Sequence, residues 1–122
     1  MTAHPNGMTL VDGGVHEGIE WATCKAPVFD AVNGYVRVPE GHPWHGLDYF
    51  HEDIDVAVHG GLTYGSVDGW IGFDCLHYGD RWPGYERPSS LPRAFTYRDW
   101  TPELVAEEAR RLASQVAKAG AR

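Results

Sequence analysis

Hydrophobic and polar residues alternate most regularly in the middle of the chain, over Ile54–Val58. The three apolar side chains of this run project to one side of an extended backbone, and the others, followed by His59, project to the opposite side. The pair Gly60-Gly61 allows a bulge, after which Leu62–Tyr64 continues the extended run. This pattern predicts a β-strand with one face in the core.

A turn and a second strand follow this run. The segment Ser66–Gly69 ends in glycine and is typical of a hairpin turn, and Trp70–Cys75 then returns antiparallel. Alternation places His59 and Asp74 on the same, non-core face of this central hairpin, provided that no bulge shifts the phase. The core face of the returning strand carries Ile71, Phe73 and Cys75.

The other extended runs are shorter. Val15–Ala22 alternates and predicts one strand, and Tyr35–Val38 follows the turn signal Asn33-Gly34. Residues 1–14 show little periodicity, which predicts a loose arm with at most a short strand near Met8–Val11. The glycines and prolines between residues 41 and 53 predict a structured loop.

The C-terminal segment has a strong helix start. Thr101 can cap the helix, Pro102 suits its first position, and Glu103 meets the positive end of the helix dipole. Trp100 can pack back onto the first turn as a hydrophobic staple. The spacing of the apolar residues predicts a helix over 101–117 with one buried stripe, formed by Leu104, Val105, Ala109, Leu112 and Val116.

These elements predict a single domain over residues 1–122. The fold class is α+β, a small antiparallel sheet with a central hairpin and a C-terminal helix packed on one face. Residues 79–95 are rich in Pro, Gly, Ser and Arg and predict a long surface loop, of the kind that often forms a lid or a binding loop.

Composition and charge narrow the function classes. The formal charge of −7 and the lack of any run of Lys or Arg disfavour bulk binding to nucleic acid. No apolar stretch approaches the length of a membrane span, and the N-terminus lacks the features of a signal peptide, so a soluble, cytoplasmic protein is expected. In that reducing compartment, Cys24 and Cys75 are expected as free thiols.

The stretch from Gly41 to Pro83 concentrates the groups that carry chemistry. It holds five of the seven histidines and three of the five tryptophans, and Arg81 is its only cation. Polar, titratable and aromatic side chains at this density are typical of a functional site. Its seven carboxylates belong to Asp48, Glu52, Asp53, Asp55, Asp68, Asp74 and Asp80.

Two chemical interpretations of this stretch involve turnover. Imidazole and carboxylate groups suit a divalent metal, although no spacing here matches a strong metal signature, and the donors would come from His42, His45, His59, Asp74, His77 and Asp80. The other is acid–base catalysis without metal, in which strand phase buries Cys75 and leaves the chemistry to His59, Asp74 and His77.

The leading hypothesis is binding of a small polar, nucleotide-like ligand without chemistry, in a pocket between the His42–Gly46 loop and the central hairpin. Trp44, Tyr64 and Trp70 would stack on a flat ring. Arg81 would offset ligand charge, and the hydrogen-bonding groups would be those of His42, His45, His59, Asp74, His77 and Asp80. A protein-interaction module is a further alternative, and a homo-oligomer fits each of these functions.

Several segments of this stretch are distinctive as a set, namely GYVxVPxGHPWHG, VHGGLTY and GWIGFDCLHYGD, with YRDW and the C-terminal helix after them. In these segments the chain resembles a set of short, uncharacterised proteins common in actinobacterial phages and their hosts. The resemblance covers roughly the middle and C-terminal two-thirds of the chain. It brings no established activity, and it implies an accessory protein that sequesters or cleaves a host defence signal.

Overall fold

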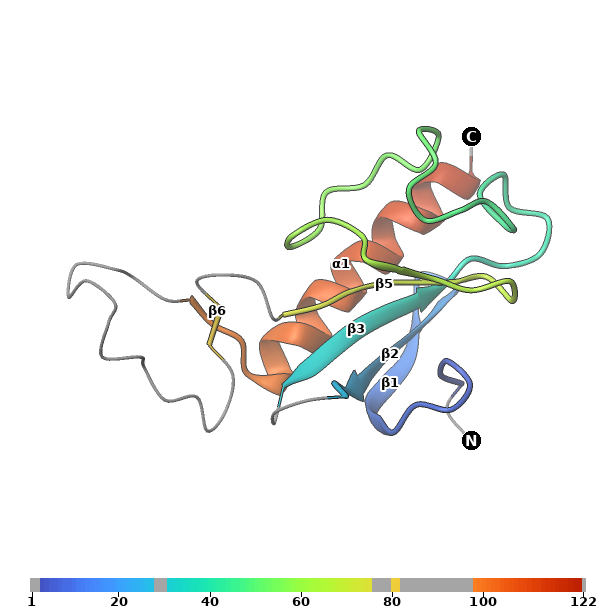
Figure 1. The fold of residues 1–122 in the computed structure, drawn as a ribbon. Coiled ribbons are helices and arrows are strands. Elements are labelled where there is room, and N and C mark those ends of the chain that lie inside the picture. Colours follow the sequence, from blue (N-terminus) through green and yellow to red (C-terminus); the bar gives the residue numbers. More distant parts are fainter. Residues whose placement is uncertain (1–2, 28–30, 76–79, 82–97, 122) are drawn as a thin grey trace.

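In the computed structural model, the described residues are 3–27, 31–75, 80–81 and 98–121. A five-stranded antiparallel sheet in the order β1-β2-β3-β5-β4 packs one face against a C-terminal helix, which confirms the predicted α+β fold (Figure 1). The elements in chain order are β1 (Leu10–His16), β2 (Ile19–Lys25), β3 (Val32–Arg37), β4 (Tyr64–Gly65), β5 (Trp70–Phe73), β6 (Asp80–Arg81), β7 (Arg98–Asp99) and α1 (Pro102–Gly120). Strands β6 and β7 pair in parallel as a separate two-stranded sheet.

The run predicted as one strand over Val15–Ala22 is instead a tight hairpin between β1 and β2. Glu17 and Gly18 form a two-residue turn with φ values of 51° and 80°, the backbone of a type I′ turn. Residues 10–14, expected within a loose arm, belong to β1. Leu10 and Asp12–Gly14 pair with β2, and the register shifts at Val11 between them. The alternation continues unbroken across the turn in the sequence, so periodicity alone does not reveal it.

The strand predicted over Ile54–Val58 is also absent, and of its predicted continuation over Leu62–Tyr64 only Tyr64 lies in a strand, so the central hairpin is short. Only Tyr64 and Gly65 form β4, which pairs with β5 across the turn predicted at Ser66–Gly69, where Gly69 has a φ of 98°. The alternation nevertheless indicates burial correctly, because Ile54 is buried and Val56 and Val58 pack partly buried against the core. Alternation reports which side chains turn inward and not whether the backbone has a strand partner.

Two clusters of buried residues cover the two faces of the sheet. The main core lies between the sheet and α1 and contains the predicted core-face residues Ile71, Phe73 and Cys75. A second core holds the buried ring of Trp70, and its other members are Ala22, Cys24 and Tyr35, with Ala3, Met8, Leu10 and Tyr64 packed against them. Both cysteines are buried free thiols.

Two glycines allow aromatic rings to approach the neighbouring strand closely. Gly34 pairs with Phe73 and Gly72 pairs with Tyr35 across the β3–β5 ladder. A Cβ atom at Gly34 would lie 2.4 Å from the Phe73 ring, and one at Gly72 would lie 2.3 Å from the Tyr35 ring. The two rings therefore occupy the space of a side chain on the opposite strand.

The helix begins as predicted. Thr101 is the N-cap, its Oγ1 accepts a hydrogen bond from the Leu104 N–H at 3.3 Å, and Pro102 occupies the first turn. The helix continues to Gly120, beyond the predicted end at Ala117. Trp100 is 1% exposed and belongs to the main core, as do four of the five predicted stripe residues, Val105, Ala109, Leu112 and Val116.

Candidate functional site

His42 ties the loop after β3 to the C-terminal end of α1. Its Nε2 lies 2.8 Å from the carbonyl oxygen of Val116, and its Nδ1 lies 3.0 Å from the backbone N–H of Trp44. Because a carbonyl only accepts and an amide N–H only donates, Nε2 carries the proton and Nδ1 is the acceptor. Both ring nitrogens serve the fold, so His42 is a structural residue here.

The aromatic residues expected to stack on a ligand are largely enclosed. Trp70 is 2% exposed within the second core, so its ring is covered by protein, and the expected stacking of this ring on a ligand stays a prediction. Trp44 is 9% exposed and packs in the main core, with its ring 5.2 Å from that of His42. Tyr64 is half-buried and meets the ring of Tyr35 edge-on at 5.3 Å. These rings stabilise the two cores.

His59 and Asp74 are not joined by the expected strand pairing. The run before β4 is not a strand, and β5 pairs with β3 and with the two residues of β4. The His59 ring lies 4.3 Å from the Trp100 ring, and Asp74 is half-buried just after β5. His77 and the side chains of Asp80 and Arg81 lie outside the described part of the structure.

The described residues contain no cluster of side chains that could hold a metal ion. Among residues 3–27, 31–75, 80–81 and 98–121, no three His, Cys, Asp or Glu side chains are gathered as metal ligands. A metal site that uses residues 76–79 or the side chains of residues 80–81 therefore stays a prediction.

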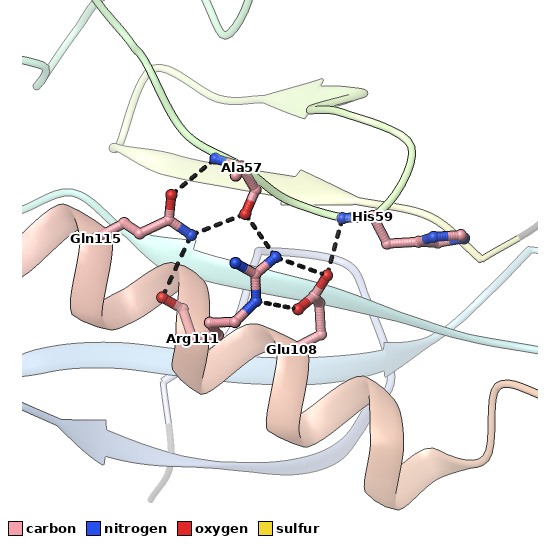
Figure 2. Close-up of polar contacts among 5 residues, drawn as sticks. All are labelled: Ala57, His59, Glu108, Arg111 and Gln115. Carbon is pink, nitrogen blue, oxygen red and sulfur yellow. Dashed lines mark hydrogen bonds and ion pairs between the residues drawn. The ribbon is translucent and has the colours of Figure 1, made fainter.

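The backbone around His59 is held by side chains of α1 instead of a strand (Figure 2). The Gln115 amide accepts from the Ala57 N–H at 2.7 Å and donates to the Ala57 carbonyl at 2.8 Å. Arg111 donates to the same carbonyl at 2.6 Å, and Glu108 accepts from the His59 N–H at 2.9 Å. These contacts satisfy backbone groups that a neighbouring strand would otherwise satisfy.

Glu108 and Arg111 also pair with each other. The Arg111 Nε donates to Glu108 Oε1 at 2.6 Å and its Nη2 donates to Oε2 at 3.1 Å, a two-point contact (Figure 2). Hydrogen bonding to the Glu108 carboxylate raises the pKa of Arg111 above its ordinary value. The ion pair holds both side chains against the backbone of residues 57–59. We therefore assign a structural role to these contacts around His59.

His45 belongs to a different environment, a surface cleft of about 380 Å³. Its Nδ1 lies 2.9 Å from the Val38 carbonyl oxygen and therefore carries the ring proton when the ring is neutral. We call this space the Arg37–His45 cleft. It is formed by the β1–β2 turn, the end of β3, the loop after it and the β4–β5 turn, and it is lined by Gly18, Glu20, Arg37, Val38, Pro39, Glu40, His45, Val67 and Asp68.

Arg37 is the central charge of the Arg37–His45 cleft. Its Nε donates to the Asp68 carbonyl oxygen at 3.3 Å, and its Nη1 lies 3.9 Å from Glu20 Oε1. Glu40 and the carboxylate of Asp68, which accepts from the Ser66 hydroxyl, add further negative charge. Three carboxylates against one guanidinium make the lining acidic when His45 is neutral.

Of the residues that line this cleft, sequence reasoning named His45 as a candidate ligand-binding residue and Asp68 only as one carboxylate of the 41–83 stretch. Arg37 lies in a short β-rich run, and Glu20 lies in a segment interpreted as one strand, so neither carried a chemical signal. The lining residues come from separate parts of the chain, and only the sheet brings the two turns and the end of β3 together. No motif in the sequence could have joined them.

A second polar cluster lies where the β1–β2 turn meets α1. His16 Nε2 lies 3.0 Å from Ser114 Oγ and 3.1 Å from Glu17 Oε2, and the Ser114 hydroxyl donates to the same Glu17 carboxylate. In a nucleophile–base–acid triad the carboxylate contacts the imidazole nitrogen remote from the hydroxyl. Here both contacts fall on Nε2, so the cluster attaches the turn to the helix.

Comparison with known proteins gives no relative on which to base a function. No family model, no curated protein and no solved structure matches the chain. Within the described residues, no helix is both long enough and apolar enough to cross a membrane.

Proposed function

We propose that this protein binds a small polar ligand in the Arg37–His45 cleft. The observation that carries the proposal is the gathering of a guanidinium, an imidazole and three carboxylates around one cavity of about 380 Å³. That volume lies within the range of about 300–1,000 Å³ that small-molecule sites occupy. The ligand class is the one expected from the sequence, a small polar ligand, but the site is the Arg37–His45 cleft and not the space between the His42–Gly46 loop and the central hairpin.

The hydrogen-bonding groups of the cleft are held in place by the fold. Arg37 is held at the Asp68 carbonyl and beside Glu20, and His45 is held at the Val38 carbonyl. The neutral His45 ring then has its acceptor at Nε2. Pre-positioned donors and acceptors reduce the ordering that a ligand must impose, which favours binding.

The charge of the lining selects the kind of ligand. Glu20, Glu40 and Asp68 outnumber Arg37, so a phosphate group would meet net repulsion. Hydroxyl and amino groups instead suit carboxylate acceptors. The cleft therefore suits the nucleoside part of a nucleotide-like ligand better than its phosphates, because the nucleoside carries ribose hydroxyls and a base amino group.

Isothermal titration calorimetry with the four common ribonucleosides and their 5′-monophosphates tests this proposal. We expect at least one nucleoside to bind in the micromolar to millimolar range, and its monophosphate to bind more weakly. Glu20→Gln and Arg37→Ala should each weaken nucleoside binding at least fivefold. Lys25→Ala provides the control, because Lys25 is exposed at the opposite end of β2.

Two results would overturn the proposal. One is that none of the eight compounds gives a heat of binding, and that mass spectrometry of the purified protein before and after denaturation also shows no bound ligand. The other is binding that Glu20→Gln and Arg37→Ala leave unchanged while circular dichroism shows that both variants are folded.

A further inference from the structure

Two exposed hydrophobic side chains line a second cavity beside the Arg37–His45 cleft. Phe50 is 72% exposed and Val67 is 97% exposed, and both border a space of about 260 Å³. This space lies between the loop of residues 46–50 and residues 65–67 at the β4–β5 turn, and we call it the Phe50 pocket. Single exposed apolar side chains are common on protein surfaces, but two around one cavity indicate a place that a ligand can cover.

The Phe50 pocket adjoins the Arg37–His45 cleft. Val67 lines both cavities, and the consecutive residues His45 and Gly46 line one cavity each. The two cavities therefore meet at the Val67 side chain. A ligand that extends from the cleft across this valine enters the Phe50 pocket directly.

The turn that carries Val67 is fixed between β3 and the loop. The Val38 N–H, at the end of β3, donates to the Gly69 carbonyl at 2.8 Å. On the other side, the loop packs so closely that a Cβ atom at Gly65 would lie 3.1 Å from the Tyr49 Cβ atom. Val67 therefore keeps its place between the two cavities.

The Phe50 ring is also held in position. The His51 N–H donates to the Asp48 carbonyl at 2.9 Å and closes a turn around Tyr49 and Phe50. The Phe50 ring meets the Tyr49 ring edge-on, with the ring centroids 5.2 Å apart, and Tyr49 packs against the main core. An exposed aromatic ring that the fold positions in this way suits stacking of a flat base.

The two cavities differ as the two parts of a nucleoside differ. The cleft presents three carboxylates, which accept hydrogen bonds from hydroxyl groups such as those of ribose. The Phe50 pocket presents the apolar side chains of Leu47, Phe50 and Val67 together with one carboxylate, that of Asp48. A flat base with an amino group at its edge matches this combination of an apolar surface and a single acceptor.

We propose that a nucleoside binds with its ribose in the Arg37–His45 cleft and its base across Val67 on the Phe50 ring. Asp48 then accepts a hydrogen bond from an exocyclic amino group of the base. This inference rests on the proposed function and adds to it the orientation of the ligand and the class of base. Purines that carry an amino group are favoured, because two fused rings cover more apolar surface than one.

Isothermal titration calorimetry with adenosine and inosine tests this orientation. Inosine has a carbonyl oxygen in place of the adenosine amino group, so adenosine should bind roughly fivefold more tightly. Phe50→Ala should weaken the binding of both nucleosides by about fivefold or more, whereas Phe50→Tyr keeps the ring and should change affinity less than about twofold. Asp48→Ala should remove most of the preference for adenosine.

Val11→Ala is the matched control. It truncates a valine that is 40% exposed near the start of β1, away from the β1–β2 turn, and should change neither affinity. Because Phe50 and Asp48 are exposed, their variants should remain folded, which circular dichroism checks.

The orientation is overturned if Phe50→Ala binds both nucleosides as tightly as wild type while Glu20→Gln weakens them, a result that leaves the proposed function standing. It is also overturned if Glu20→Gln, and not Asp48→Ala, removes the preference for adenosine, since the base would then lie in the cleft. If neither nucleoside binds wild type, the orientation is overturned, and the titration with all eight compounds decides the proposed function separately.

Discussion

The side chain of Gln115 forms two hydrogen bonds with the backbone of Ala57, accepting from its N–H at 2.7 Å and donating to its carbonyl at 2.8 Å (Figure 2). A primary amide offers the same donor and acceptor as a peptide group. Gln115 thus satisfies Ala57 as a residue of a neighbouring strand would. The segment predicted as a central strand is instead attached to the helix through side chains.

Removing this amide should loosen the segment. Gln115→Ala is expected to lower the free energy of unfolding by roughly 1–2 kcal/mol, because two hydrogen bonds of modest net value are lost at an exposed position. Gln115→Glu can accept from the N–H but cannot donate to the carbonyl, so its loss should be intermediate between wild type and Gln115→Ala. Urea denaturation measures both, with Lys118→Ala on the same helix as the control. Equal stability of Gln115→Ala and wild type would contradict this role.

Glu108 and Arg111 should contribute to stability in a coupled way. The two-point contact predicts a coupling energy of about 0.5–1 kcal/mol in a double-mutant cycle of Glu108→Ala and Arg111→Ala, because the Arg111 side chain is half exposed and screened. Arg111→Lys should lose most of this coupling, since lysine lacks the planar fork. Additive effects of the two alanine variants would show that the pair contributes nothing.

Alkaline pH should destabilise the protein through its second core. Burial raises the pKa of Cys24 from its ordinary value of 9.0 to about 11, and burial raises the pKa of Tyr35 from 10.0 to about 12. The folded state therefore retains protons that the unfolded state has lost. Stability should be unaffected by these groups below about pH 9 and should fall as pH rises through 11 for Cys24 and 12 for Tyr35, by up to roughly 3 kcal/mol each.

Thermal unfolding across this pH range measures the effect. Cys24→Ala should remove the part of the decline that lies between pH 9 and about 11, and Tyr35→Phe should remove the part at higher pH. The native Cys24 thiol should also react slowly with iodoacetamide at pH 8, because it is buried and protonated. An unchanged pH profile in Cys24→Ala would refute the assignment.

Close packing of rings over glycines should make β3 and β5 intolerant of added methyl groups. Gly34→Ala brings a Cβ atom to 2.4 Å from the Phe73 ring, inside van der Waals contact, and should destabilise the fold by about 1–3 kcal/mol. Phe73→Leu vacates part of that space, so the double variant should lose less than the sum of the two single losses. Chemical denaturation measures the cycle, and simple additivity would exclude the steric explanation.

Local signals predicted the parts of the fold that depend on local physics. Thr101 and Pro102 start α1 because a cap and a preset φ act within one helical turn. Ile71 and Phe73 face the main core because strand side chains alternate. The turn at Ser66–Gly69 follows from glycine in a positive-φ position. Each of these features is decided by residues close together in the chain.

The candidate site depended on contacts between distant segments, and the sequence did not determine those. His42, expected to hold a ligand, hydrogen-bonds Val116, and Trp70 fills a core made partly by the N-terminal arm. Ile54–Val58 carries a strand pattern, yet the backbone of Ala57 within it bonds side chains of α1 far along the chain.

The Arg37–His45 cleft exists only because the sheet order places the β1–β2 turn, the end of β3 and the β4–β5 turn at the same end of the sheet. The sequence alone determined the helix, the core faces and the class of fold, since each follows from a local period or cap. Tertiary structure alone decided which polar groups meet, because a hydrogen-bond partner is chosen by distance in space and leaves no period in the chain.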